Sequence, residues 1–181
     1  WSKSLKTTSK TVALALAEEI YAERKGRLSI GVRPISITGK ELITTYENHR
    51  RKSLTDIPHL GITPRSLDTL TRHIKHWEDY LNISGHRNTK LEDIPTELGT
   101  NFGLYIKEKK KKAFKDTPRV NGTINHTIAA VKLMYKYAID ERYITQNEMP
   151  KFKYLKVDRE IRPTRDVLTK EEREQISKYM R

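Results

Sequence analysis

Apolar residues recur along most of this chain at steps of three and four positions, the spacing of one face of an α-helix. The pattern is longest after Pro64, and Gly85 ends it. A proline is tolerated in the first turn of a helix, and Thr63 before it has the hydroxyl of a suitable cap. The sequence therefore predicts a helix here with one buried stripe. The stripe consists of Leu67, Leu70, Ile74, Trp77 and Leu81.

The same periodicity predicts four more helices, separated by glycines, prolines or charged breaks. They cover residues 9–24, 40–52, 96–112 and 122–142, and Gly26 is the expected stop of the first. Asn121 or Thr123 can cap the helix at 122–142. A further helix is expected from Thr169, where Thr169-Lys170-Glu171-Glu172 fits a capping box. No segment predicts a strand, so we expect an all-α fold, a small helical bundle preceded by a helix and a linker.

The charge of the chain points to a polyanionic partner. There are 36 Lys and Arg against 23 Asp and Glu, a net charge of +13 with neutral histidines, in 181 residues. Such an excess attracts polyanions and releases their counterions, and basic domains of this kind commonly bind nucleic acid. Two other interpretations stay open: a basic surface that serves solubility, and basic helices that meet acidic protein partners.

Several classes of protein are disfavoured by what the sequence lacks. It has no apolar run long enough to span a membrane, no visible secretory leader, and no cysteine for disulfides, thiolate zinc sites or thiol catalysis. The phosphate-binding and nucleophile motifs of common enzymes are missing, and the six histidines are scattered. We therefore expect no catalytic residue, no metal and no cofactor in these residues, and a cytoplasmic setting.

One exposed line of hydrogen-bond donors is expected on the helix after Pro64, opposite the stripe that contains Trp77. Polar residues fall there at steps of four, three and four: Arg65, Thr69, Arg72 and His76. Such a line can lie along a DNA groove, with arginine reaching phosphates or guanine edges and threonine bonding a phosphate. The plainer interpretation is that every amphipathic helix has a polar face.

A second line is expected on the helix at 122–142. Its approach, Arg119-Val120-Asn121-Gly122-Thr123, places amides and small polar side chains at a helix N-terminus, where phosphate binds readily. The outward face continues through Asn125, Lys132 and Lys136. A plainer interpretation needs no DNA: these residues cap the helix and give it a polar face that keeps the protein soluble. If both lines bind DNA, two basic helices grip a duplex from one side, and the lysine-rich run at 107–112 adds nonspecific phosphate contacts.

Four short motifs follow one another in a recognisable order. Ser4-Leu5-Lys6-Thr7-Thr8 precedes an alanine-rich helix, and residues 123–138 form one continuous helical pattern. Ile144-Thr145-Gln146-Asn147 leads to Pro150, and Val167-Leu168-Thr169-Lys170-Glu171-Glu172 comes later. In this order the motifs resemble the tyrosine recombinases of the phage integrase family. The counterparts there are the tail of an arm-site-binding domain, the last large helix and Asn-Pro exit of the core-binding domain, and the opening of the catalytic domain. Here two residues separate Asn147 from Pro150.

The resemblance implies a SAM-like core-binding domain, a small orthogonal helical bundle that clamps one face of a DNA half-site. In this family a C-terminal catalytic domain supplies arginines that neutralise the phosphate and a tyrosine that forms a covalent 3′-phosphotyrosyl link, without a metal or nucleotide. No position of this sequence matches that catalytic set. We therefore expect the fragment to bind DNA and to cut nothing.

The resemblance also implies the domain boundaries. Residues 1–37 would be the tail of an arm-site-binding domain with a helix and linker, 38–145 the core-binding domain, 146–166 an interdomain linker and 167–181 the start of a catalytic domain. The parent protein would integrate and excise a mobile element as a homotetramer on double-stranded DNA. The fragment would be a cytoplasmic, nucleoid-associated monomer. A non-enzymatic interaction module and a DNA-binding regulator stay open as alternatives, although the connection at 53–63 is longer than a helix-turn-helix turn.

Overall fold

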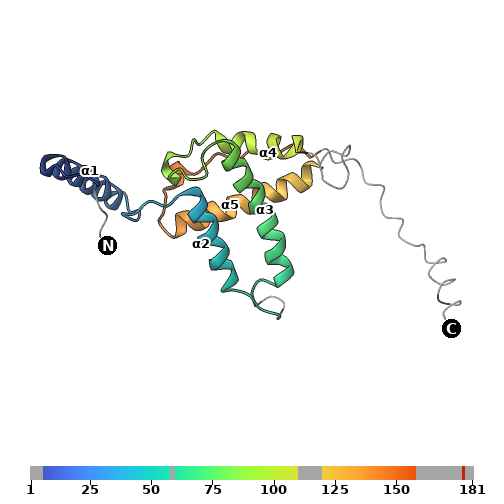
Figure 1. The fold of residues 1–181 in the computed structure, drawn as a ribbon. Coiled ribbons are helices and arrows are strands. Elements are labelled where there is room, and N and C mark those ends of the chain that lie inside the picture. Colours follow the sequence, from blue (N-terminus) through green and yellow to red (C-terminus); the bar gives the residue numbers. More distant parts are fainter. Residues whose placement is uncertain (1–5, 58–59, 110–119, 158–176, 178–181) are drawn as a thin grey trace.

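The computed structural model describes residues 6–57, 60–109, 120–157 and 177. Within these residues the chain forms five α-helices and two short 3-10 turns, with no strand (Figure 1). The elements are α1 (Lys10–Ser29), α2 (Gly39–Arg51), α3 (Pro64–Ile83), η1 (Leu91–Asp93), α4 (Leu98–Glu108), α5 (Asn121–Asp140) and η2 (Gln146–Glu148). The expected all-α class is confirmed. Of the helix expected from Thr169, Ser177 is described and is helical, and the other residues lie outside the described ones.

The predicted cap of α3 is confirmed, because Thr63 accepts a hydrogen bond from the backbone of Ser66 at 3.2 Å. The structure adds a cap that was not predicted: Thr38 caps α2 through a complete capping box with Glu41. Both caps satisfy backbone N–H groups that have no partner inside the helix.

Three predicted ends are wrong. The first helix does not stop at Gly26 but runs on to Ser29, and the chain turns at Gly31, whose φ of +79° favours glycine. The fourth helix is shorter than predicted, at 98–108. The α5 helix begins after Val120 without a side-chain cap, because the Asn121 amide is directed to the backbone of Lys156 instead.

The core is built where α5 runs across α2, α3 and α4 (Figure 1). Trp77 of α3 is fully buried at its centre, and its ring makes edge contacts with Phe102 of α4 at 4.9 Å and Tyr135 of α5 at 5.9 Å between centroids. These contacts join three helices in one aromatic cluster, which fixes the relative positions of their outer faces. All five predicted core positions of α5 are buried: Ile124, Ile128, Val131, Tyr135 and Ala138.

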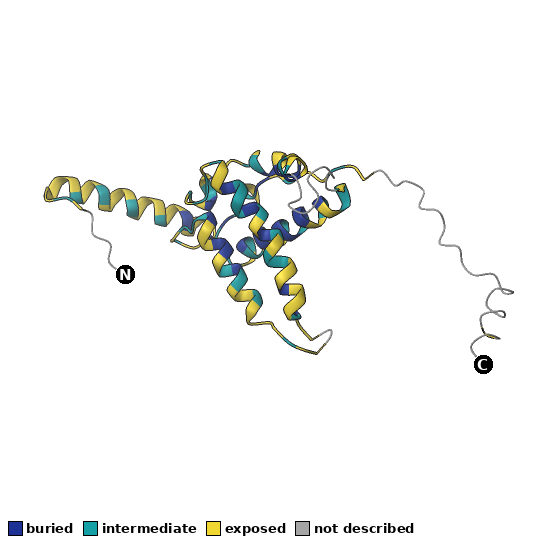
Figure 2. Cartoon of the chain, turned by 45° about the vertical axis from the view of Figure 1, so that its right-hand side comes forward, coloured by how far each residue is buried: buried dark blue, intermediate teal, exposed yellow. Residues whose placement is uncertain are grey.

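The α1 helix projects from the bundle and exposes most of its length (Figure 2). Arg27 is its one buried residue, and it anchors the end of the helix. Its guanidinium donates to the carbonyl oxygens of Arg33 at 2.9 Å and Tyr143 at 2.8 Å, and pairs with Glu92 at 2.8 Å. The α1 helix is therefore attached by a polar anchor and not by an apolar face.

The described residues that directly follow η2 pack on the helices. We call residues 149–157 the strap. Phe152 of the strap enters the aromatic cluster, 5.2 Å from the ring of Trp77, and Leu155 packs against the core. The family resemblance implies an interdomain linker at 146–166. Its first part forms no long helix, yet it is part of the packed structure.

Candidate nucleic-acid interface

The predicted line on α3 lies on the outside of the bundle. We call Arg65, Thr69, Arg72 and His76 the α3 row. Arg65, Thr69 and Arg72 are exposed and His76 is half-buried. Within the described residues, the structure gives no carboxylate within 4.0 Å of Arg65 or Arg72. The positive charge of both arginines is therefore available to an anion in solution.

Thr69 contributes less than the sequence suggests. Its hydroxyl donates to the carbonyl oxygen of Arg65 at 3.0 Å, one turn earlier on the same helix. Because that proton is used inside the helix, the hydroxyl in this arrangement offers only lone pairs outward. A phosphate oxygen is itself a hydrogen-bond acceptor, so Thr69 can bond it only if the hydroxyl rotates away from the Arg65 carbonyl.

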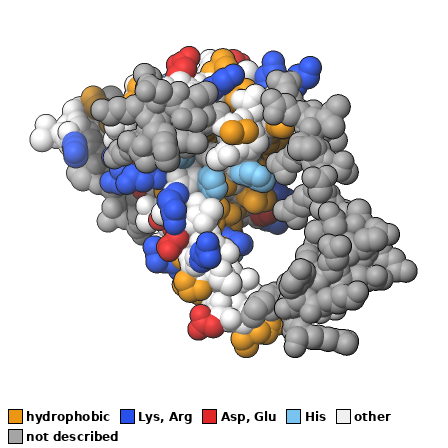
Figure 3. All heavy atoms as spheres, turned by 90° about the vertical axis from the view of Figure 1, so that its right-hand side faces the viewer, with side chains coloured by type: hydrophobic (Ala, Val, Ile, Leu, Met, Phe, Trp, Pro, Cys, Tyr) orange, Lys and Arg blue, Asp and Glu red, His pale blue; other side chains and the backbone are white. Residues whose placement is uncertain are grey.

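The α3 row borders the contact between α3 and α5. His73 lies next to Arg72 on α3, and its Nδ1 is 2.8 Å from the buried hydroxyl of Thr127 on α5. Thr123 is four residues before Thr127 and so lies on the same side of α5. Figure 3 shows the side of the molecule on the right in Figure 1, with histidine side chains at its middle and Lys and Arg side chains around them. The structure thus brings Thr123 to the α3 side.

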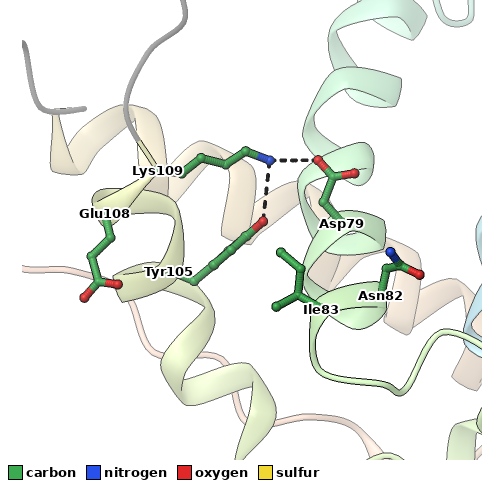
Figure 4. Close-up of a pocket in the computed structure, with 6 residues that line it drawn as sticks. All are labelled: Asp79, Asn82, Ile83, Tyr105, Glu108 and Lys109. Carbon is green, nitrogen blue, oxygen red and sulfur yellow. Dashed lines mark hydrogen bonds and ion pairs between the residues drawn. The ribbon is translucent and has the colours of Figure 1, made fainter. Parts of the chain in front are cut away.

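A carboxylate further along α3 is neutralised by an ion pair. Lys109, at the end of α4, reaches Asp79 at 2.8 Å and the hydroxyl of Tyr105 at 3.4 Å (Figure 4). The hydrogen bond to Asp79 is the main reason that the pKa of Lys109 is raised. Asp79 follows Arg72 by two helical turns, so its charge would otherwise oppose an anion at the α3 row. Lys109 is for the same reason not the free phosphate contact expected from the lysine-rich run.

The predicted line on α5 lies on another side of the bundle. We call Asn121, Asn125, Lys132 and Lys136 the α5 row. Asn125 is two residues before Thr127, so at 100° per residue it points about 160° away from the side that meets α3. The Asn125 amide donates to the carbonyl oxygen of Leu155 and accepts from its N–H, both at 2.8 Å. Asn125 is therefore not brought to the side of the α3 row, whereas Lys136 near the other end of α5 lines a pocket together with Ser66 and Leu70 of α3.

The remaining members of the α5 row differ in their surroundings. Asn121 donates to the carbonyl oxygen of Lys156 at 2.7 Å. Lys132 is half-buried, with its ammonium 5.0 Å from the centre of the Tyr154 ring, while Lys136 is exposed. Arg119, the first residue of the expected phosphate seat, lies outside the described residues. Both asparagines thus bond the chain's own backbone, and direct DNA contact by the α5 row stays a prediction.

Sequence reasoning missed two features of this surface. Lys75 is exposed near the α3 row, but it does not fall on the line that the spacing of the row picked out. The Thr127 hydroxyl was not singled out, because a threonine inside an apolar stripe gives no signal of the histidine that it meets. Among the described residues, no group of three or more His, Asp or Glu could hold a metal ion, and none of the helices there is suited to cross a lipid bilayer.

The surface and the fold together define a basic, all-α domain with one anion-accessible helix face. Comparison with known families assigns it further: residues 41–154 match the family described as the phage integrase SAM-like domain. The match covers more than half of the chain, and the chain belongs to this family. No curated protein and no solved structure matches it.

The family gives the surface a general role. A phage integrase SAM-like domain is the part of these recombinases that does not carry out the chemistry, and its role is DNA binding related to site-specific recombination. The match begins inside α2 and ends within the strap, so the family domain includes the α3 row, α5 and most of the strap, while α1 lies before it.

Proposed function

We propose that this chain is the core-site-binding portion of a tyrosine recombinase, and that the α3 row is its principal contact with double-stranded DNA. The observation that carries the proposal is the pair of exposed arginines, Arg65 and Arg72, which have no carboxylate partner among the described residues. They lie on the helix whose buried side holds Trp77. The row is therefore presented by a rigid element.

The charges around the row support this choice of face. The described ion pairs neutralise Arg27, Arg33, Arg87, Lys90 and Lys109, all of which lie outside the row. Lys75 and Thr123 extend the surface on α3 and α5. DNA that lies along α3 thus meets Arg65, Arg72 and Lys75, which outnumber the exposed carboxylate of Asp68 on the same part of the helix. The excess of cations favours phosphate contacts over binding to a neutral partner.

In this proposal the domain recognises one half-site of a core recombination sequence, and the chain itself cuts nothing. Arg72 is the better candidate for reading a base edge, because it lies near the middle of α3, while Arg65 in the first turn is suited to a phosphate. The parent recombinase would act in integration and excision of a mobile element, as a tetramer on DNA.

The test is a titration of the chain against labelled duplex DNA by fluorescence anisotropy over a range of salt concentrations. With about six phosphates contacted, we expect the logarithm of the affinity to fall against the logarithm of salt with a slope on the order of −5. Polyglutamate serves as the matched competitor. If the basic helices bind acidic proteins instead of DNA, polyglutamate should displace the duplex when both are added at the same total negative charge. Binding without salt dependence, or displacement of this kind, would overturn the DNA-facing role.

Two further measurements test the finer parts of the proposal. Selection from a random duplex library should enrich one half-site, and failure to enrich any sequence contradicts core-site recognition. Incubation with supercoiled DNA should leave it intact and yield no covalent protein–DNA complex. A phosphotyrosyl adduct would show that the chain carries chemistry of its own.

A further inference from the structure

The strap at residues 149–157 packs against two glycines of α4, and glycine lowers the stability of a helix. Gly99 and Gly103 are both buried on one side of α4, one turn apart. Glycine inside a helix is less favourable than alanine, because it loses more backbone freedom on folding. Two buried glycines in one short helix therefore need an explanation, and the close approach of the strap provides it.

The reason at Gly99 is the close approach of the backbone. A Cβ atom there would lie 2.9 Å from the carbonyl oxygen of Lys151, a distance that Cβ atoms in proteins essentially never show. At Gly103 a Cβ would lie 3.4 Å from the Leu155 side chain and 3.3 Å from that of Ile128. The two glycines thus leave the space in which the strap runs between α4 and α5.

Hydrogen bonds then fix the strap at both of its ends. Near the beginning, Lys151 donates its N–H to the carbonyl oxygen of Thr96 at 2.7 Å and accepts from the Thr100 hydroxyl at 3.1 Å. Near the end, the Asn125 amide forms two bonds with Leu155, one in each direction. The Asn125 amide thus bonds both the N–H and the C=O of Leu155, as the backbone of a neighbouring β-strand would. The two bonds together fix the direction of the backbone at Leu155.

From these contacts we propose that the strap is a latch and that Asn125 is its positioning residue. In the latched state residues 149–157 keep one fixed direction relative to α3, so the α3 row, to which the proposed function assigns DNA, and Val157 move as one body. In the released state the strap separates from α5, and the amides of Asn121 and Asn125 become free. Strap release therefore uncovers the polar part of the α5 row.

Two substitutions release the strap by different routes. Gly99→Ala places a methyl group against the backbone of Lys151 while it improves the helix propensity of α4. Asn125→Asp keeps the acceptor for the Leu155 N–H but replaces the donor by a charged oxygen that faces the Leu155 carbonyl. The matched controls are Gly122→Ala, where a Cβ meets nothing within 4 Å, and Asn101→Asp on the exposed side of α4.

Three readouts follow the strap itself. Hydrogen exchange measures the protection of the Leu155 amide, and limited proteolysis with trypsin measures the rate of cleavage after the exposed Lys153 and Lys156. The chain has no cysteine, so the double variant Thr44→Cys/Val157→Cys can be spin-labelled at these two positions alone. The distribution of distances between the two labels then measures the position of the strap relative to α2. Helical circular dichroism and the thermal midpoint report the bundle, and none of these measurements involves DNA.

We expect a narrow distance distribution in the unsubstituted chain and in both controls. Gly99→Ala and Asn125→Asp should broaden it, lower the protection of the Leu155 amide by about tenfold and speed tryptic cleavage, with helical content unchanged. The proposal fails if the unsubstituted chain already shows a broad distribution, or if both substitutions leave the narrow one in place. It also fails if the strap is released only in variants whose bundle unfolds at the same time.

Discussion

Removing the two arginines of the α3 row gives the most direct test of how this domain meets DNA. Arg65 and Arg72 are seven residues apart, which at 1.5 Å per residue is about 10 Å along α3. DNA advances by about 3.4 Å per nucleotide along one strand, so the two side chains span about three steps and reach different phosphates or bases. Their contributions should therefore be nearly independent.

The expected size of the effect follows from that separation. Each phosphate contact contributes about 0.9 to the salt slope, so the double variant Arg65→Ala/Arg72→Ala should reduce its magnitude by about 1 when Arg72 reads a base edge, and by about 2 when both arginines contact phosphates. If each arginine supplies about 1 kcal/mol, binding weakens by about 30-fold at constant salt. Both side chains are exposed, so the fold should stay intact.

The assay is the anisotropy titration with duplex DNA at several salt concentrations. The matched control is Lys25→Ala/Lys10→Ala, which removes two exposed cations from the projecting α1 helix and leaves α3 unchanged. We expect this control to change the slope less than the arginine pair does. Equal effects from the two variants would show that only net charge matters, and an unaltered slope in the arginine variant would refute the assignment of DNA to α3.

Three other predictions concern the framework that presents this face. Trp77→Ala removes the centre of the aromatic cluster and should lower the free energy of unfolding by about 3–5 kcal/mol in a denaturant titration; a loss below 1 kcal/mol would contradict the central place of the ring. Arg27→Met leaves Glu92 without its partner and should cost about 3 kcal/mol, with α1 reorienting independently of the bundle in NMR relaxation; unchanged relaxation would mean that another contact holds α1. Burial raises the pKa of the Tyr135 phenol above its ordinary value of about 10, so folding stability should be fully present below pH 10 and decline as the pH rises further. Tyrosinate absorbance measured with circular dichroism checks this, and Tyr135→Phe should remove part of the decline; the same decline in that variant would point to other groups.

Much of the helical framework can be read from the sequence, because local patterns decide it. The stripe around Trp77 and the five buried positions of α5 follow from periodicity, since an apolar face at helical spacing has to be covered by other elements. The caps at Thr38 and Thr63 are equally local, because each needs one hydroxyl and a backbone amide three residues later. The family resemblance rests on the same kind of short-range motif.

The limits of sequence reasoning appear at contacts between distant residues. Asn121 and Asn125 fit a row of outward donors as long as α5 is considered alone. The strap bonds both of them only because the chain returns 35 residues after Asn121 and 30 residues after Asn125. Gly26 marks a helix stop by its propensity, yet α1 continues past it to the anchor at Arg27. In both cases a contact with a distant part of the chain decides the outcome, and at Gly26 it outweighs a helix-propensity cost of about 1 kcal/mol.

Charge and periodicity belong to the chain alone, and they suffice to predict a basic helical domain with an arginine-bearing face on its third helix. Which polar residues share a surface depends on the folded arrangement. That arrangement takes Asn125 away from the α3 side, pairs Lys109 with Asp79, and bonds the asparagines of α5 to the strap. This is because a side chain's partner depends on how helices cross and where the chain returns, and neither is encoded in the spacing within one helix.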